Sequence, residues 1–313
     1  MNNNILHVGL DVGSTTVKIV VMNDKKETIY KDYQRHYSDT KNTVCNVLEK
    51  LNSDFPNSKF TLALTGSGAL SVSKFLGVSF IQEVVSCKRA VEKYIPQTDV
   101  VIELGGEDAK IIYFDESIEQ RMNGTCAGGT GAFIDQMASL LHTDPSGLNE
   151  YAKKYNTIYP IASRCGVFAK TDIQPLINEG AAKEDIAASI FQAVVNQTIS
   201  GLACGRPIRG KIAFLGGPLT YLSELRTRFI ETLKLKDDEI IVPDEAHLLV
   251  AKGAALDSLH EEPFSNKELK NKIENLKKSH DTTTQPLEPL FENDEEYKKF
   301  VKRHETATVK KRV

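Results

Sequence analysis

Hydrophobic and polar positions divide the first hundred residues into strand and helix patterns. Two apolar, β-branched runs flank a short polar turn between Ile5 and Met22, which predicts a hairpin. A third strand is predicted over Thr28 to Arg35 and a fourth over Lys59 to Leu64. Apolar residues at the helical period predict helices over Thr40 to Leu51 and Gln82 to Tyr94. The predicted order is therefore β-β-β-α-β-α.

A second unit begins at Asp99 and repeats the start of this plan. Val100 to Phe114 again alternate as strand, acidic glycine turn and strand. Further strands are predicted over Lys211 to Leu215 and at Ile240 to Pro243. The predicted helices of this part are Gly131 to Leu141, Val167 to Glu179, Lys183 to Cys204, a segment ending at Leu233, and Leu248 to Leu256. The pattern predicts an α/β protein with two similar halves.

Domain boundaries follow from this repeat and from a change in composition. We expect a first half over residues 1–98, completed by a C-terminal helix at 248–260, and a second half over residues 99–247. After His260 the chain is dense in both charge signs and poor in aliphatic residues. Residues 261–313 are therefore predicted to form a charged linker or arm with a solvated surface.

Composition excludes several classes of protein. The chain has 313 residues, 41% of them hydrophobic, which is enough for two domains with cores of their own. A net charge of -3, with both signs interspersed, offers no electrostatic footprint for nucleic acid or an anionic membrane. The amino terminus lacks the pattern of a secretion signal, and no apolar run approaches the length of a membrane span. We expect a soluble, cytoplasmic protein.

The tip of the first hairpin has the composition of a phosphate-binding turn. A glycine followed by small polar residues leaves backbone amides free to face a phosphate. Mg²⁺ keeps most of its waters and is held by one or two carboxylates, so Asp11 is a candidate catalytic residue and magnesium ligand. The predicted nucleotide-binding residues of this hairpin are Gly13, Ser14, Thr15, Thr16 and Lys18.

Two further glycine turns strengthen this prediction. Glu103 precedes Gly105 and Gly106 in the second hairpin, which makes Glu103 a second candidate magnesium ligand and catalytic residue. A third turn, Gly216-Gly217-Pro218, follows another predicted strand. Neither a P-loop motif nor a complete Gly-x-Gly-x-x-Gly is present in the sequence, so neither of those nucleotide folds competes.

Five cysteines are present, without any Cys-x-x-Cys pair, which argues against zinc ribbons and redox dithiols. Cys126 and Cys165 each stand just before a predicted helix, where free amides stabilise a thiolate. A four-iron cluster takes four thiolates, and two chains related by a two-fold axis supply two each. The other three cysteines, Cys45, Cys87 and Cys204, are expected to be inert buried residues.

The three turns resemble the phosphate and adenosine motifs of the acetate kinase, sugar kinase, Hsp70 and actin superfamily. With Cys126 and Cys165 the resemblance narrows to the ATP-dependent activators of 2-hydroxyacyl-CoA dehydratases, the BadF/BadG/BcrA/BcrD ATPase family. It covers roughly residues 5–257. Together with the charged tail, the sequence looks most like the first module of the large activase-type proteins.

The resemblance implies an actin-like ATPase fold, with two ribonuclease H-like halves around a nucleotide cleft. It also implies a homodimer that binds ATP and Mg²⁺, with one 4Fe-4S cluster shared through Cys126 and Cys165. Such an activator takes an electron from a ferredoxin or flavodoxin and passes it, as ATP is hydrolysed, to an iron-sulfur dehydratase or a double-cubane cluster protein. The second motif departs from the family pattern at Glu103, where Asp is usual, and at Glu107, where many activators have Gln. Glu107 is predicted to position water or act as a base.

Two other functions are compatible with the same glycine turns. A small-molecule kinase of the superfamily would phosphorylate a sugar or carboxylate, and the cysteines would then be structural. A kinase needs a catalytic Asp in a substrate cleft, and no convincing candidate stands out in the sequence. A nucleotide-dependent scaffold resembling actin would assemble through the charged tail and would bind no iron.

Overall fold

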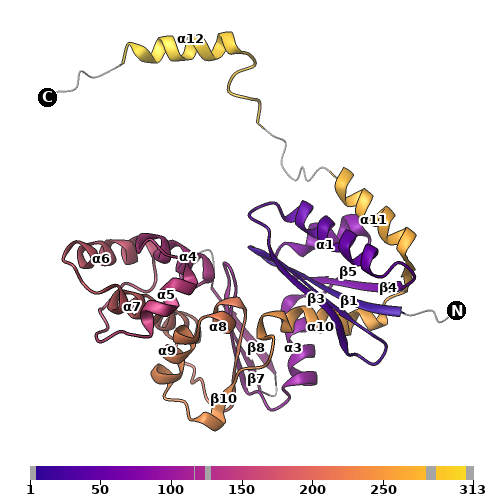
Figure 1. Cartoon of the computed structure of the whole chain (residues 1–313), viewed down its shortest axis with the longest axis horizontal. Helices are drawn as coiled ribbons and strands as arrows, with labels where there is room; N and C mark the ends of the chain where they lie inside the picture. The colour runs from indigo at the N-terminus through magenta and orange to yellow at the C-terminus, as the bar shows by residue number, and fades with distance from the viewer. Residues whose placement is uncertain (1–4, 116, 124–127, 280–286, 308–313) are drawn as a thin grey trace. The chain divides into compact units, whose positions relative to one another are not determined.

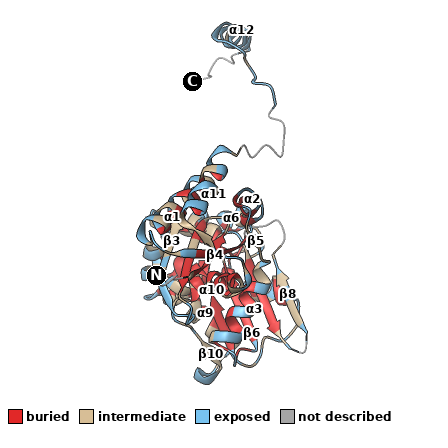
Figure 2. Ribbon diagram, turned by 90° about the vertical axis from the view of Figure 1, so that its right-hand side faces the viewer, coloured by how far each residue is buried: buried red, intermediate tan, exposed pale blue. Residues whose placement is uncertain are grey.

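The computed structural model describes residues 5–115, 117–123, 128–279 and 287–307. The chain divides into a large unit, Met1–Lys278, and a small unit, Ser279–Val313. In the large unit, two sheets are each covered by helices, and α3 (Glu83–Tyr94) and α10 (Leu249–Asp257) cross in the middle (Figure 1). Buried residues concentrate in the strands and in α10 (Figure 2).

The first sheet has the strand order β11-β4-β1-β2-β3, with β5 also paired to β4. β1 runs antiparallel to β2 and parallel to β4. Every residue of β1 except Ile5 is buried, because helices cover both faces of this strand. The strands are β1 (Ile5–Val12), β2 (Thr16–Met22), β3 (Thr28–Arg35), β4 (Lys59–Thr65), β5 (Ser79–Phe80) and β11 (Phe264–Ser265).

The second sheet has the order β10-β9-β6-β7-β8 and repeats the first. β6 runs antiparallel to β7 and parallel to β9, as β1 does to β2 and β4. The prediction of an α/β fold with two similar halves is therefore confirmed. The strands are β6 (Val100–Leu104), β7 (Ala109–Phe114), β8 (Ile118–Met122), β9 (Ile212–Leu215) and β10 (Ile240–Ile241).

Helices pack their apolar faces on these sheets. In α1 the buried residues Val44, Val47, Leu48 and Leu51 recur at the helical period and join the core of the first sheet. The helices around the first sheet are α1 (Thr40–Asp54), α2 (Ala69–Leu76) and α11 (Asn266–Lys278). Those of the second half are α4 (Gly131–Leu140), α5 (Pro145–Ala152), α6 (Gly166–Asn178), α7 (Lys183–Asn196), α8 (Gly217–Tyr221) and α9 (Ser223–Leu233).

The crossing of α3 and α10 connects the two halves. α3 buries Cys87, Ala90 and Val91 against the second sheet, while α10 packs on β1 and β2 of the first. The helices touch closely, because a Cβ on Gly253 of α10 would overlap the Ser86 carbonyl of α3. Only glycine allows this approach.

The prediction that the charged arm begins at residue 261 was wrong. β11 pairs antiparallel with β4, and α11 buries Leu269, Ile273 and Leu276 in the core of the first half. These three residues lie on one face of a helix, a spacing that a comparison of average composition misses. The segment outside the large unit begins only at Ser279.

α7 continues into η1 (Gln197–Ala203), a π-helix, so the predicted long helix is one continuous element of two types. Among the described residues, Lys183–Ala203 is the one helix long and apolar enough to span a membrane by length and composition, but 67% of its most apolar window is buried in the protein. Its apolar side chains belong to the core of the second half.

The small unit contains α12 (Asp294–Glu305), whose first amides are capped by the Asn293 side chain. Phe291 contacts Tyr297 and Phe300 at ring-centroid distances of 5.4 and 5.2 Å. No residue of α12 is buried.

Candidate functional site

The tips of the β1–β2 and β6–β7 hairpins have the same backbone geometry. The Gly13 amide donates to the Thr16 carbonyl at 2.9 Å, and the Gly105 amide donates to the Asp108 carbonyl at 2.7 Å. Each hairpin also places an acid directly across from a lysine. The cross-strand pairs are Asp11 with Lys18 and Glu103 with Lys110.

Asp11 forms a buried ion pair in the first hairpin. Its Oδ2 accepts a hydrogen bond from Lys18 Nζ at 2.7 Å, and the two side chains are 2% and 13% exposed. Burial by itself lowers the pKa of Lys18, but the carboxylate of Asp11 outweighs it and raises that pKa above its ordinary value. Lys18, predicted as a nucleotide-binding residue, is therefore held by Asp11 in this structure.

The end of β4 lies against Asp11. Thr65 is the neighbour of Asp11 in the parallel ladder, so both side chains stand on the same face of the sheet. The Thr65 hydroxyl is buried and makes no hydrogen bond within the described residues. Gly66 has φ +100°, and a Cβ there would lie 2.5 Å from Asp11 Oδ1. This turn leaves no room for a side chain beside the carboxylate.

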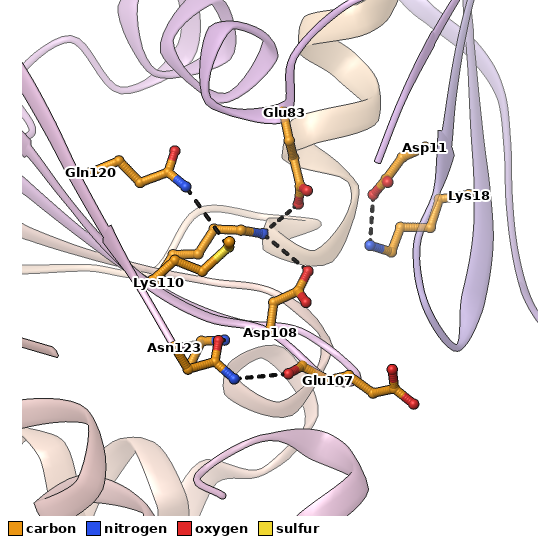
Figure 3. Close-up of polar contacts among 10 residues, drawn as sticks. Asp11, Lys18, Glu83, Glu107, Asp108, Lys110, Gln120 and Asn123 are labelled. Carbon is orange, nitrogen blue, oxygen red and sulfur yellow. Dashed lines mark hydrogen bonds and ion pairs between the residues drawn. The ribbon is translucent and has the colours of Figure 1, made fainter. Parts of the chain in front are cut away.

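The second hairpin distributes its charges differently. Lys110 Nζ donates to Glu83 Oε1 at 2.6 Å and lies 3.4 Å from Asp108 Oδ2, as Figure 3 shows. Glu103 is 5% exposed, and its Oε2 has no hydrogen-bond partner among the described residues. Burial raises the pKa of Glu103 to about 7, although Lys110 acts in the opposite direction. Glu103 is thus a buried acid with an unused oxygen.

The two turns touch one another across the halves. A Cβ on Gly106 would overlap the side chain of Thr15, so glycine is required where the second turn approaches the first. Gly13 and Gly105 have no such neighbour, because the nearest atoms to an added Cβ lie at 3.5 and 3.4 Å. The predicted phosphate turns are therefore brought together, with Ser14 half-buried and Thr16 buried at the base of the first.

The third glycine turn lies next to the second hairpin and borders a cavity. Gly216 has φ +88°, and a Cβ there would overlap the Leu104 carbonyl. Gly217 and Pro218 begin α8 and line a cavity of about 500 Å³. Tyr33 and Arg35 of β3, Asp135 of α4 and Tyr221 of α8 also line this cavity. Arg35 and Asp135 form an ion pair at 3.1 Å that connects the two halves.

The residues present suit a magnesium–nucleotide complex. Asp11 and Glu103 supply carboxylate oxygens, one of which is buried and unsatisfied, and the glycine turns supply backbone amides for phosphates. Among the described residues, no three His, Cys, Asp or Glu side chains converge to hold a metal by themselves. Mg²⁺ would take one or two carboxylates here, with waters and phosphate oxygens as its remaining ligands.

Four polar residues of this site were not predicted from the sequence, and one predicted residue, Glu107, lies outside its buried part. The missed residues are Thr65, Glu83, Asp108 and Lys110. Lys110 follows Glu103 at the same spacing as Lys18 follows Asp11, which was a usable signal; Glu83 had none, because it arrives from another element. Glu107 is exposed, and its side chain points away from the other acids in Figure 3. Its predicted catalytic role stays a prediction.

Cys165 lies at a helix start, as predicted. It is the N-cap residue of α6, and its thiol is half-buried. The nearby backbone amides of Phe168 and Val167, at the start of α6, lower the pKa of the Cys165 thiol. Both neighbouring side chains are exposed, Val167 by 70% and Phe168 by 65%. This turn therefore presents a thiol with a lowered pKa beside two exposed apolar side chains.

The other cysteines fall into three situations. Cys126 lies outside the described residues. Cys45 and Cys87 are buried, in agreement with an inert structural role, and burial raises the pKa of both thiols. The expectation that Cys204 is buried was wrong, because it caps the end of η1 in a left-handed conformation and is exposed. Its helix has ended, so no neighbouring turn covers it.

Comparison with known proteins agrees with this geometry. The 2-hydroxyisocaproyl-CoA dehydratase activator of Clostridioides difficile is 31% identical over 84% of this chain and 98% of that protein. The crystal structure of Acidaminococcus fermentans (R)-2-hydroxyglutaryl-CoA dehydratase component A superposes with a TM-score of 0.70 and 28% identity. That match covers 85% of this chain and 99% of the other.

A second solved structure, the Clostridium difficile 2-hydroxyisocaproyl-CoA dehydratase activator with bound ADPNP, has a TM-score of 0.68 and 26% identity, covering 89% of this chain and all of that one. These two structures confirm the predicted actin-like fold. The model of the BadF/BadG/BcrA/BcrD ATPase family matches residues 8–258. The chain therefore belongs to the BadF/BadG/BcrA/BcrD ATPase family.

Proposed function

We propose that this ATPase is a reductive activator of an iron-sulfur partner. Two copies share one 4Fe-4S cluster, and ATP hydrolysis drives the transfer of one low-potential electron to an acyl-CoA dehydratase or a double-cubane cluster protein. The observation that carries the proposal is the half-exposed Cys165 thiol at the start of α6, beside exposed Val167 and Phe168. The names of the relatives, activators of acyl-CoA dehydratases, support the choice of partner.

In this proposal the two acidic turns bind the nucleotide. Asp11 and Glu103 would hold Mg²⁺, and the amides of the Gly13 and Gly105 turns would hold phosphates. Gly217 and Pro218, which follow Gly216 in the third turn, line the cavity that would receive the adenosine. When bound, Mg²⁺ neutralises the charge that develops on the transferred phosphoryl group. The close contact of Gly106 with Thr15 would hold the two turns together around the phosphates.

In this proposal two cysteines from each copy bind the cluster. Cys126 and Cys165 of two chains together supply the four thiolates that a 4Fe-4S cluster takes. When bound, the cluster carries the single electron. The positive end of α6 and the amides of Val167 and Phe168 favour an anionic ligand at Cys165. A ferredoxin or flavodoxin would supply the electron, and the labile cluster suits a reducing cytoplasm.

Anaerobic reconstitution tests the proposal. Wild-type protein should form a dimer with about four irons, as one shared cluster requires. Cys165→Ser should lose the cluster absorbance while ADP affinity, measured by calorimetry, stays unchanged. Cys204→Ser is the matched control, because Cys204 is an exposed cysteine of the same half. Full iron content in Cys165→Ser, or a wild-type protein without iron, would overturn the cluster assignment.

A further inference from the structure

One face of the edge strand β3 contacts the second half of the molecule. Lys31, Tyr33 and Arg35 alternate along the strand, so their side chains stand on the same face of the first sheet. Tyr33 is the ladder neighbour of Lys18, and Lys18 lies opposite Asp11 in the next pair of strands. The three residues of β3 therefore share a face of the sheet with the ion pair of the first hairpin.

Two of these residues form ion pairs with the second half. Lys31 pairs with Glu245, in the loop that precedes η3 (Ala246–Leu248). Arg35 donates through Nη1 and Nη2 to the carboxylate of Asp135 in α4, at 3.1 and 3.5 Å. The Arg35 and Asp135 side chains are 48% and 36% exposed, so this pair contributes little by itself. The two ion pairs lie on either side of Tyr33 along the strand.

Between the ion pairs, the ring of Tyr33 packs against two rings of the second half. Its centroid lies 5.3 Å from that of His247 and 6.1 Å from that of Tyr221, with interplanar angles of 85° and 63°. Edge-to-face ring pairs of this kind are favourable beyond the area that they bury. His247 and Tyr221 also contact each other, at 5.1 Å. The Tyr33 hydroxyl lies 3.1 Å from the position of a Cβ added to Gly217, so Tyr33 stands against the third glycine turn.

The same contacts form a wall of the cavity beside the third glycine turn. Tyr33 and Arg35 line this cavity from the first half, and Asp135 and Tyr221 line it from the second. If the halves separate here, the ring contacts and the ion pair of Arg35 must break together. Because that ion pair is half-exposed, the ring contacts of Tyr33 are the larger part of the barrier.

We propose that Tyr33 is a positioning residue that sets the rates at which nucleotide enters and leaves this cavity. Its ring holds the two halves together through Tyr221 and His247. Arg35 assists through Asp135. The inference rests on the proposed function only for the placement of the nucleotide. It adds a kinetic role for β3, a strand that holds none of the predicted phosphate-binding residues.

Rapid mixing with a fluorescent ADP analogue and Mg²⁺ tests the proposal. Tyr33→Leu keeps an apolar side chain on β3 but removes the ring contacts. We expect the association and dissociation rate constants to rise together by about tenfold, as the loss of two aromatic contacts predicts. The dissociation constant should stay within about twofold, because a contact between the halves slows entry and release alike. Unchanged rates would overturn the inference, and so would a rise in the dissociation rate alone, which would show that Tyr33 binds the nucleotide directly.

A second variant makes the corresponding change from the other half. Tyr221→Leu alters a side chain that is 56% exposed, so it should fold normally and should raise both rate constants as Tyr33→Leu does. Lys50→Ala is the matched control, because Lys50 pairs with Asp32 at 3.7 Å on the other face of β3, within the first half. It should keep the wild-type rates. An effect of Lys50→Ala equal to that of Tyr33→Leu would refute the specific role of Tyr33.

Charge reversal tests the contribution of Arg35. Arg35→Asp places two carboxylates together and should raise both rate constants by about threefold, the order of an exposed ion pair. Adding Asp135→Arg restores the pair with its charges exchanged, so the rates should return to their wild-type values. A double variant as fast as Arg35→Asp would contradict the role given to Arg35.

Hydrogen exchange of the nucleotide-free protein tests the contact without a ligand. Separation of the halves removes Tyr33 from α8, so the helical amides of Thr220 and Leu222 should exchange faster. We expect an increase of about threefold in Arg35→Asp and a return to the wild-type rate when Asp135→Arg is added. Equal exchange in all three proteins would overturn the inference.

These outcomes are distinct from a failure of the proposed function. If Glu103→Gln weakens binding of the analogue but Tyr33→Leu leaves the rates unchanged, only the role of Tyr33 is refuted. If Glu103→Gln leaves binding unchanged, the placement of the nucleotide is refuted, and the kinetic role of Tyr33 with it. Neither measurement concerns iron, so the Cys165→Ser experiment decides the cluster assignment separately.

Discussion

The tips of the β1–β2 and β6–β7 hairpins share their residue types but differ in electrostatics. Each sets an acid opposite a lysine and closes its turn with a glycine amide. In the first hairpin, Lys18 pairs with Asp11 at 2.7 Å. In the second, Lys110 is bonded to Glu83, and a buried oxygen of the cross-strand acid Glu103 has no hydrogen-bond partner in the part of the chain that the structure describes.

The difference comes from outside the hairpin. Glu83 is the first residue of α3, the helix that crosses α10 between the halves, and it brings a third acid to Lys110. Burial raises the pKa of both acids, but Asp11 is paired with Lys18, whereas Glu103 Oε2 has no hydrogen-bond partner among the described residues. Two hairpin tips with the same residue types therefore differ. In the first the carboxylate is paired with a lysine, and in the second a buried carboxylate oxygen favours the binding of an added cation. Four predictions test this comparison, from the largest effect to the smallest.

Removing the acid of the first hairpin should have the largest effect. Asp11→Asn leaves the buried Lys18 ammonium without its carboxylate, which costs about 3–5 kcal/mol of unfolding free energy. Glu103→Gln breaks no ion pair of this kind and should cost much less. Urea unfolding of the nucleotide-free variants measures both. Equal losses would show that the two acids are in equivalent environments after all.

The second-largest effect should come from adding a methyl group to each turn, because the two turns differ in the space they leave for one. Gly106→Ala forces a methyl group into Thr15 and should cost about 1–3 kcal/mol, the usual cost of overpacking. Gly13→Ala is the control, because the nearest atom to its added Cβ lies at an ordinary 3.5 Å. Thermal unfolding compares the two variants. If Gly106→Ala is as stable as Gly13→Ala, the turns do not touch as described.

Stability should depend on pH through Glu103. Its pKa is about 7 in the folded protein and ordinarily 4.5, so between these values the folded state holds a proton that the unfolded state has lost. This contribution therefore falls as pH rises from about 4.5 to about 7, by at most about 1.4 kcal/mol per pH unit, and is constant above. Glu103→Gln should remove that slope in urea unfolding series. A slope that survives the substitution must arise elsewhere.

Converting the second hairpin into the first should have the smallest effect. Glu83→Gln removes the competing charge and leaves Glu103 as the cross-strand acid for Lys110, so we expect a loss of about 1 kcal/mol. The pKa of Glu103 should fall, which moves the pH-dependent slope to lower pH. Glu92→Gln, an exposed change on the same helix, is the control. An unchanged slope in Glu83→Gln would show that Glu83 does not set the state of Glu103.

Local patterns predicted much of this protein because they are repeated within short segments. The two hairpins, their acids and glycines, and the helix start at Cys165 are all features of neighbouring residues, and the structure places them as expected. Average composition was a less reliable guide to the domain boundary. In α11 the charged residues on one face hide the apolar residues on the other when composition is averaged. Residue type alone was also a poor guide for Cys204, which was expected to be buried and is exposed.

The sequence by itself determined the duplicated strand plan, the acidic glycine turns and a cysteine at a helix start, because strand alternation, turn chemistry and helix capping act over a few residues. Tertiary structure alone decided which lysine satisfies which acid, since Glu83 reaches Lys110 from a helix far from the hairpin. It also decided that Asn123 and the first amides of α4 are hydrogen-bonded to the turn between β6 and β7. Such pairings depend on how separate elements pack, and no local spacing encodes them.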